Sequence, residues 1–211
     1  LPAFGPLGTT RTTVAGVSFD MVKLPPGRFT DGEGPTRREL LVSRPFEIGT
    51  TLVTQALWRA VMGDEPSKFR GEDRPVEQVS WDDVQGFLVR LTDLGFPGFR
   101  LPTEAEWAWA ARCGVPTRWS GADRVQSVAV VDVARTAPVA GLSSSATGAF
   151  DFSGNLWEWQ LDGWAVAPPA GVDLQAPASG SYRVHRGGGW SFVPQYARVA
   201  YRLLDAPGCR S

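Results

Sequence analysis

The sequence predicts a single α+β domain with short helices, short strands and long irregular loops. Three helix-start signals fall between residues 54 and 113, whereas the flanking segments contain short apolar runs typical of strands. The 211 residues include 24 glycines and 17 prolines, well above ordinary usage, together with nine tryptophans. Because disordered chains are poor in aromatic residues, this composition indicates an ordered fold that is rich in turns.

The charge balance argues against several classes of partner. Lysine and arginine number 21 against 22 acidic residues, so no positive surplus is available to neutralise nucleic-acid phosphates. No segment approaches the roughly 20 apolar residues that a membrane span requires. We therefore expect a monomer without nucleic-acid or membrane partners. The chain shows no signal peptide, so the cytoplasm is favoured, with surface display if a signal was removed.

Each predicted helix begins at a residue whose side chain can cap it. Thr54 opens the first helix and Ser80 the second, and Gly63 and Gly95 end them. Thr103 opens the third, and a glutamate three residues later completes a capping box. Four acidic residues lie in the first turns of the second and third helices, where the helix dipole favours negative charge: Asp82, Asp83, Glu104 and Glu106.

Strands are predicted near both ends of the chain, with a long loop between them. The candidates are Val17–Leu24, Phe29, and residues 40–48, 182–186 and 198–204. Residues 1–16 are expected to form a linker or an arm. Residues 115–180 are rich in Gly, Ser, Ala and Pro, and tryptophans within this segment are expected to hold it in place: Trp157, Trp159 and Trp164.

Four ordered stretches carry a family resemblance. The first two are Met21-Val22 to Pro26-Gly27-Arg28-Phe29, and Pro75-Val76 with Val79-Ser80-Trp81-Asp82-Asp83. The third is Phe99-Arg-Leu-Pro-Thr-Glu-Ala-Glu-Trp107, and the fourth is Gly154-Asn-Leu-Trp-Glu-Trp159 followed by Arg186-Gly-Gly-Gly-Trp190. Together with the segments around them, from about residue 17 to residue 210, they resemble the formylglycine-generating enzyme (sulfatase-modifying factor) family. The resemblance implies a C-type-lectin-like fold for residues 1–211 as one domain.

The resemblance also bears on catalysis. Enzymes of this family oxidise a substrate cysteine with copper held by two cysteines placed shortly after the glycine-rich motif, and soft sulfur ligands select Cu(I). Residues 190–198 contain no cysteine, and the chain's two cysteines are Cys113 and Cys209. The iron-dependent relatives need a histidine-rich site, whereas His185 is the only histidine. We therefore expect no enzymatic activity and neither copper nor iron.

The C-terminal segment resembles a second group with the same scaffold, the variable proteins of diversity-generating retroelements. Their pattern is matched here by the glycine run and by Trp190, Pro194, Arg198 and Arg202. The resemblance implies a ligand-binding segment at about residues 190–211 for an unidentified protein or other macromolecule. It assigns variation to ten positions between the fixed residues: Ser191, Phe192, Val193, Tyr196, Tyr201, Leu203, Leu204, Ala206, Cys209 and Ser211.

The side chains in this segment support display, although one alternative stays open. Many of the variable positions carry apolar or aromatic residues, and an exposed apolar patch usually marks a binding site. Tyrosine in particular offers a large contact area at low entropic cost. In the alternative, Val199 and Tyr201 point into the core and Leu203 merely packs.

A calcium site is a further implication of the resemblance. Asp151-Phe-Ser-Gly-Asn-Leu-Trp-Glu158 is similar to a calcium-binding loop of the family. The ligands would be the carboxylates of Asp151 and Glu158 and the main-chain oxygens of Gly154 and Leu156, and such hard oxygen ligands suit a structural calcium ion. The alternative is a turn in which Asn155 and Glu158 bond to the backbone.

Two other functions stay open at this point. One is a formylglycine-generating type of oxidase, or a catalytically dead relative of it. The other is a calcium-dependent carbohydrate-binding lectin, although the sequence lacks an evident Glu-Pro-Asn-like sugar loop.

Overall fold

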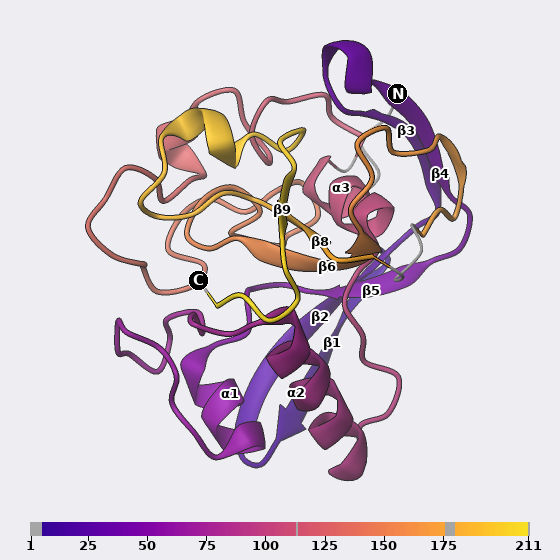
Figure 1. Ribbon diagram of the computed structural model, residues 1–211. Helices are drawn as coiled ribbons and strands as arrows, with labels where there is room; N and C mark the ends of the chain where they lie inside the picture. Colours follow the sequence, from indigo (N-terminus) through magenta and orange to yellow (C-terminus); the bar gives the residue numbers. More distant parts are fainter. Residues whose placement is uncertain (1–5, 113, 176–179, 211) are drawn as a thin grey trace.

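The computed structural model describes residues 6–112, 114–175 and 180–210 and has the predicted α+β architecture (Figure 1). Its helices are α1 (Gln55–Met62), α2 (Trp81–Asp93) and α3 (Glu104–Arg112), with 3-10 helices η1 (Gly34–Thr36), η2 (Val125–Ser127) and η3 (Pro194–Ala197). Its strands are β1 (Gly8–Val14), β2 (Val17–Leu24), β3 (Gly27–Asp31), β4 (Arg38–Val42), β5 (Phe46–Gly49), β6 (Glu158–Gly163), β7 (Gly171–Val172), β8 (Arg183–Arg186) and β9 (Leu203–Asp205).

The strands form three small sheets around α3. Their orders are β1-β2-β5, β3-β4-β7 and β6-β8-β9, and only the pairing of β4 with β7 is parallel among the described strands. Figure 1 shows α1 and α2 against β1 and β2, with the yellow C-terminal segment beside β6 and β8. In the described part of the chain, no helix has the length and apolar character needed to cross a bilayer.

The three capping signals act as predicted. The hydroxyl of Thr54 accepts a hydrogen bond from the Leu57 amide at 3.2 Å. Ser80 accepts from the Asp83 amide at 3.1 Å. At α3, the Glu106 carboxylate accepts from the Thr103 amide at 2.8 Å, which forms the capping box. Local sequence therefore decides where each helix begins.

The N-terminal expectation of a linker or arm is wrong for residues 8–14. These residues form β1, which pairs along its whole length with β2 in antiparallel register, and Arg11 contacts Asp20 across the pair at 2.8 Å. The segment has few apolar residues, because most of β1 is exposed and only Val14 is buried. Its pairing partner, and not its own pattern, makes it a strand.

Other strand predictions are corrected in their bounds. The predicted strand at 40–48 is two strands, β4 and β5, which lie in different sheets and are separated around Pro45. Of residues 198–204, only Leu203 and Leu204 lie in a strand, β9. Strand β6 was not predicted, because it buries polar side chains such as Gln160 and so lacks apolar alternation.

The Pro-Pro-Gly turn after β2 has a packing reason. A Cβ on Gly27 would lie 2.2 Å from the Trp109 ring, so the indole passes directly over the glycine. The Trp109 indole N–H also donates to the Pro25 carbonyl at 2.9 Å. Both Trp107 and Trp109 of α3 are buried, and α3 contacts β3, β4 and β6. The third helix therefore forms the centre of the main core.

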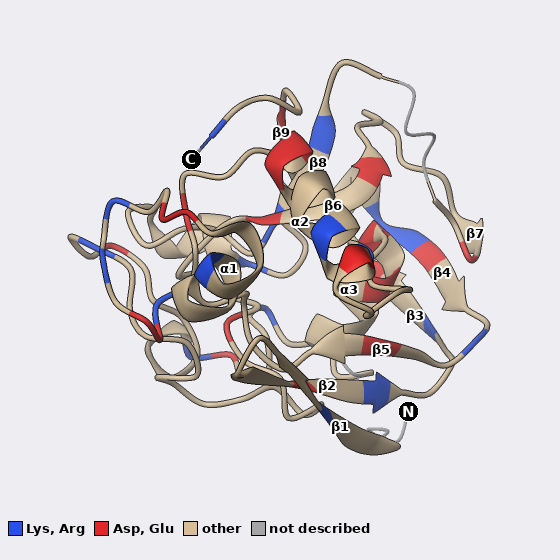
Figure 2. Cartoon of the chain, turned by 90° about the horizontal axis from the view of Figure 1, so that it is seen from below, with Lys and Arg blue, Asp and Glu red and all other residues tan. Residues whose placement is uncertain are grey.

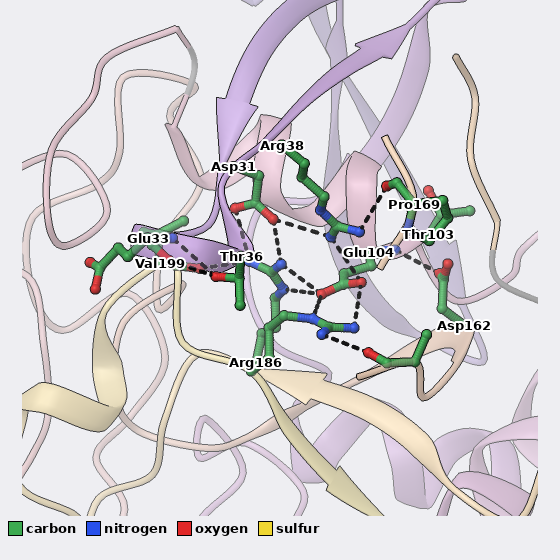
Figure 3. Close-up of polar contacts among 12 residues, drawn as sticks. Asp31, Glu33, Thr36, Arg38, Thr103, Glu104, Asp162, Pro169, Arg186 and Val199 are labelled. Carbon is green, nitrogen blue, oxygen red and sulfur yellow. Dashed lines mark hydrogen bonds and ion pairs between the residues drawn. The ribbon is translucent and has the colours of Figure 1, made fainter. Parts of the chain in front are cut away.

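A buried cluster of charged side chains crosses this centre (Figure 3). Arg186 of β8 is fully buried, and its Nη2 lies 2.6 Å from a carboxylate oxygen of both Asp31 and Glu104. Arg38 approaches the same two carboxylates at 3.2 and 3.0 Å. Arg202 of the C-terminal segment binds Glu104 as well. The cluster thus joins β3, β4, α3, β8 and the C-terminal segment.

The interpretation of Glu104 as a simple helix-dipole charge is therefore incomplete. Burial by itself would raise the pKa of Glu104, but the charges of Arg186, Arg202 and Arg38 hold that pKa below its ordinary value. Burial likewise opposes ionisation of Asp31, and the Arg186 charge lowers its pKa overall.

Elsewhere, Figure 2 shows acidic and basic residues interspersed along the chain.

Replacing Glu104 by glutamine is expected to destabilise the fold strongly. The variant keeps the side-chain shape but leaves Arg186, Arg38 and Arg202 with one carboxylate fewer, and breaking a buried ion pair costs about 3–5 kcal/mol. Urea unfolding measures the loss. The matched control is Glu65→Gln, whose exposed pair with Arg59 should contribute far less to stability because solvent screens it. Equal losses in the two variants would contradict the cluster's role.

The contribution of Glu104 should also depend on pH. Its folded pKa lies below the ordinary value of 4.5, so the stabilisation is fully present above pH 4.5 and is lost as the pH falls further. The difference in unfolding free energy between the wild type and Glu104→Gln should therefore be constant from pH 7 to 5. It should then shrink towards pH 3. A difference that stays constant down to pH 3 would show that Glu104 does not titrate in this way.

Candidate functional site

The C-terminal segment follows a glycine run that brings two backbones into contact. Gly187 and Gly188 have positive φ angles of 93° and 79°. A Cβ on Gly188 would lie 2.8 Å from the Cα of Ala197 in η3. Glycine is therefore required at Gly188, both for its conformation and for the close packing of η3.

Each residue predicted to form the fixed frame makes contacts outside the segment. The Trp190 amide donates to the Asn155 carbonyl at 2.8 Å, and the Pro194 carbonyl accepts from the Trp119 indole at 3.0 Å. Arg198 pairs with Glu33 at 2.5 Å. Arg202 enters the buried cluster and lies 4.4 Å from the Trp164 ring centroid. The backbone between these residues is thus held at four points.

The predicted variable residues differ in exposure. Ser191, Phe192 and Val193 are exposed, Phe192 by 37% and Val193 by 41%. Five others are half-buried: Tyr196, Tyr201, Leu203, Leu204 and Ala206. Cys209 is exposed and free, and Ser211 lies outside the described residues.

Four aromatic rings form one continuous group, which we call the aromatic patch: Trp157, Phe192, Tyr196 and Tyr201. Phe192 and Tyr196 have ring centroids 5.5 Å apart, and Tyr196 and Tyr201 are 4.9 Å apart, both edge to face. The Trp157 ring lies 5.5 Å from Phe192 and 6.1 Å from Tyr201. Such geometry is favourable for aromatic pairs. The structure therefore brings three predicted variable residues together and adds Trp157.

Two hollows flank the aromatic patch. One, of about 450 Å³, is lined by Arg118, Trp119, Gln195, Tyr196, Arg198 and Tyr201. The other, of about 240 Å³, includes Phe69, Trp157, Trp190, Ser191 and Phe192 in its lining. Pockets that hold ligands are concave and rich in aromatic side chains, with a few polar groups. The C-terminal surface is likewise hollowed and lined by aromatic side chains with a few polar groups.

The remaining predicted positions lie apart from the aromatic patch. Leu203 and Leu204 belong to β9, where they pair with His185 and Val184 of β8. Farther on, the Pro207 carbonyl accepts from the amide of Asp82 at the start of α2. The residues around Ala206 and Cys209 therefore lie near α2. Val199 is fully buried, so the inward alternative is confirmed for it.

Sequence reasoning missed several residues of this surface, among them Trp157, Arg118 and Trp119. Trp157 was interpreted only as a residue that holds the long loop, although it belongs to the conspicuous Gly-Asn-Leu-Trp-Glu-Trp motif. Arg118 and Trp119 lie in a loop that carries no motif, about 80 residues before the C-terminal segment. They meet the segment through the Arg118 carbonyl, which accepts from the Val199 amide at 3.1 Å.

The loop from Asp151 to Glu158 is a tight turn with a buried carboxylate at its end. Asn155 exchanges hydrogen bonds with the backbone of Ala137 at 3.0 and 3.2 Å, so the turn alternative is confirmed for Asn155. One Asp151 oxygen accepts from the Ala140 amide at 2.9 Å. Burial raises the pKa of Glu158 to about 8, although the neighbouring Trp107 side chain acts to lower it.

Some of the predicted calcium ligands converge near Gly187. A Cβ on Gly187 would lie 3.5 Å from both Glu158 Oε1 and the Leu156 carbonyl oxygen, and 3.6 Å from the Phe152 carbonyl oxygen. The Gly154 amide donates to the Gly187 carbonyl at 2.7 Å. Among the described residues, His, Cys, Asp and Glu side chains do not gather in groups of three that could hold a metal. Any cation here would therefore depend on main-chain oxygens.

Known proteins resemble this chain in sequence. The sulfatase-modifying factor enzyme 1-like domain matches residues 10–211. The formylglycine-generating enzyme of Thermomonospora curvata is 30% identical over 183 residues, which cover 74% of this chain and 58% of that enzyme. The chaperone protein LppX of Paenibacillus barcinonensis is 28% identical over 249 residues, covering 91% of this chain and 86% of that protein.

A solved structure shows the same fold over nearly the whole chain. Treponema denticola variable protein 1 superposes with a TM-score of 0.89 and 30% identity, covering 96% of this chain and 95% of that one. The predicted C-type-lectin-like fold and both parts of the resemblance are confirmed. The chain belongs to the sulfatase-modifying factor (formylglycine-generating enzyme) family.

Proposed function

We propose that this protein is a non-enzymatic ligand-binding protein, a variable protein of a diversity-generating retroelement, which binds a macromolecule through residues 190–211. The observation that carries the proposal is the aromatic patch, in which Phe192, Tyr196 and Tyr201 stand between frame residues. The likeness to Treponema denticola variable protein 1 over 96% of the chain supports it.

The backbone of the segment does not depend on its variable side chains. The Phe192 carbonyl accepts from the Asp132 amide at 3.0 Å, and the Trp190 carbonyl accepts from the Val133 amide at 2.9 Å. These bonds survive any change of the Phe192 side chain. A backbone fixed in this way keeps the binding surface pre-organised, which lowers the entropic cost of binding.

The chain's own residues favour binding over oxidation. Copper oxidases of the family need two thiolates after the glycine run, and residues 190–198 contain none. Phe192 and Tyr196 lie in that stretch and contribute rings to the aromatic patch. Aromatic anchors of this kind often dominate the binding energy of an interface.

Substitutions at variable positions should leave the fold nearly intact. For Phe192→Ser we expect a loss of about 1 kcal/mol of unfolding free energy, because only surface ring contacts disappear. For Arg202→Gln in the frame we expect about 3–5 kcal/mol, because Glu104 loses a buried partner. Urea unfolding of both variants measures the contrast.

Two results would contradict this proposal. One is a loss for Phe192→Ser as large as that for Arg202→Gln. The other is formylglycine formation when the protein is given copper and a cysteine-containing sulfatase-motif peptide. The adjacent genomic DNA offers an independent check, since a near-copy of the final coding segment beside a reverse transcriptase gene is expected.

We also propose a structural calcium ion beside Gly187. Glu158 Oε1 and the carbonyl oxygens of Leu156 and Phe152 converge there, and the Oε1 atom is buried. Hard oxygen ligands of this kind suit calcium. The ion would replace the proton that burial favours on Glu158 and would stabilise the long loop that precedes it.

Calcium is therefore expected to raise the melting temperature relative to protein treated with a chelator. At 100 times its Kd, a ligand adds about 2.7 kcal/mol of stability. That is on the order of 5–10 °C for a domain of this size. Glu158→Gln should abolish the response, whereas the exposed control Glu72→Gln should keep it. If calcium does not change the melting temperature of the wild type, the proposed site is excluded.

A further inference from the structure

The larger hollow beside the aromatic patch is lined by positively charged side chains. It is lined by two guanidinium groups, Arg118 and Arg198, by the rings of Trp119, Tyr196 and Tyr201, and by Gln195. We call it the arginine hollow. No carboxylate is among these lining residues, although the chain as a whole is nearly neutral. A hollow of about 450 Å³ is large enough for one or two partner side chains.

The guanidinium group of Arg118 is available to bind a ligand. Its side chain is exposed, lies 5.6 Å from the Trp119 ring centroid, and forms no ion pair with any residue that the structure describes. The nearby Asp123 carboxylate accepts from the Arg118 backbone amide at 3.1 Å and not from its guanidinium. The five N–H donors of this guanidinium are therefore available to a ligand.

Arg198 is oriented more firmly. Its Nε donates to the Gln195 carbonyl at 2.9 Å, and its Nη1 binds Glu33 at 2.5 Å. Within the described residues its Nη2 has no hydrogen-bond partner. Because two of its nitrogens are held, this arginine presents the remaining donor at low entropic cost.

Both arginines are placed by contacts that involve no variable side chain. The Arg118 carbonyl accepts from the Val199 amide, and the neighbouring Trp119 indole donates to the Pro194 carbonyl. Two variable residues, Tyr196 and Tyr201, complete the lining. The hollow thus combines a constant cationic part with a part that changes between variants.

We propose that the arginine hollow binds the carboxylate of an aspartate or glutamate in an acidic segment of a protein partner. Arg118 donates to the carboxylate and Arg198 adds a second donor, since guanidinium and carboxylate groups match in geometry and charge. Tyr196 and Tyr201 contact the adjacent residue of the partner. This inference rests on the proposed function and adds to it a preference for acidic partners that is shared by all variants.

A pair of peptides tests this preference. The probe is acetyl-Gly-Glu-Glu-Tyr-Glu-Glu-Gly-amide, and its neutral match replaces each glutamate by glutamine. By isothermal titration at low salt, we expect the acidic peptide to bind at least about tenfold more tightly than the neutral one, since charge-assisted hydrogen bonds are the stronger kind. Arg118→Gln should weaken the acidic peptide about tenfold, whereas the control Arg124→Gln, an exposed arginine outside the lining, should not.

Four results would overturn the inference. Two concern the peptides: equal affinity for both, or no detectable binding of either. The others are an unchanged Kd in Arg118→Gln and tighter binding of a thymidine 20-mer than of the acidic peptide. Tyr196→Ser separates this inference from the proposed function. It should lower the affinity for both peptides and keep their ratio. If the two peptides bind equally well but Phe192→Ser loses as little stability as expected, the preference for acidic partners is wrong. The proposed variable binding surface is then unaffected.

Discussion

The contact of Arg186 with Asp31 and Glu104 is the interaction on which the rest of the structure depends. Arg186 is fully buried, and its two partners come from residues 155 and 82 positions earlier in the chain. A buried guanidinium is tolerated only when it is paired, so β3, α3 and β8 must come together for any of these charges to be satisfied. Arg202 then extends the same cluster into the C-terminal segment.

This arrangement separates the support of the surface from the surface itself. The frame residues of the C-terminal segment point to Glu104, Glu33 and the loop carrying Trp119, while the backbone amides and carbonyls bond to neighbouring loops. Side chains between the frame residues, such as Phe192, contribute ring contacts and little of the backbone support. Substitutions between the frame residues are therefore expected to cost little stability.

The same surface combines two kinds of side chain. The aromatic patch provides rigid apolar contact area, and the arginine hollow beside it provides directional charged donors. Aromatic residues and arginine are the types that most often dominate interface energies. Trp157 belongs to the patch and also lies within the loop from Asp151 to Glu158, which packs against Gly187, so the position of that loop affects the shape of the patch.

The sequence by itself determined the local features. Thr54, Ser80 and Thr103 marked the helix starts because a cap acts within one turn, and the motifs and the family followed from ordered local patterns. Only the tertiary structure decided that residues 8–14 form β1, that Glu104 is buried among arginines, and that Arg118 and Tyr201 line the same hollow. The physical reason is distance along the chain. Such pairings depend on groups tens of residues away, and a short window of sequence contains only one of the two partners.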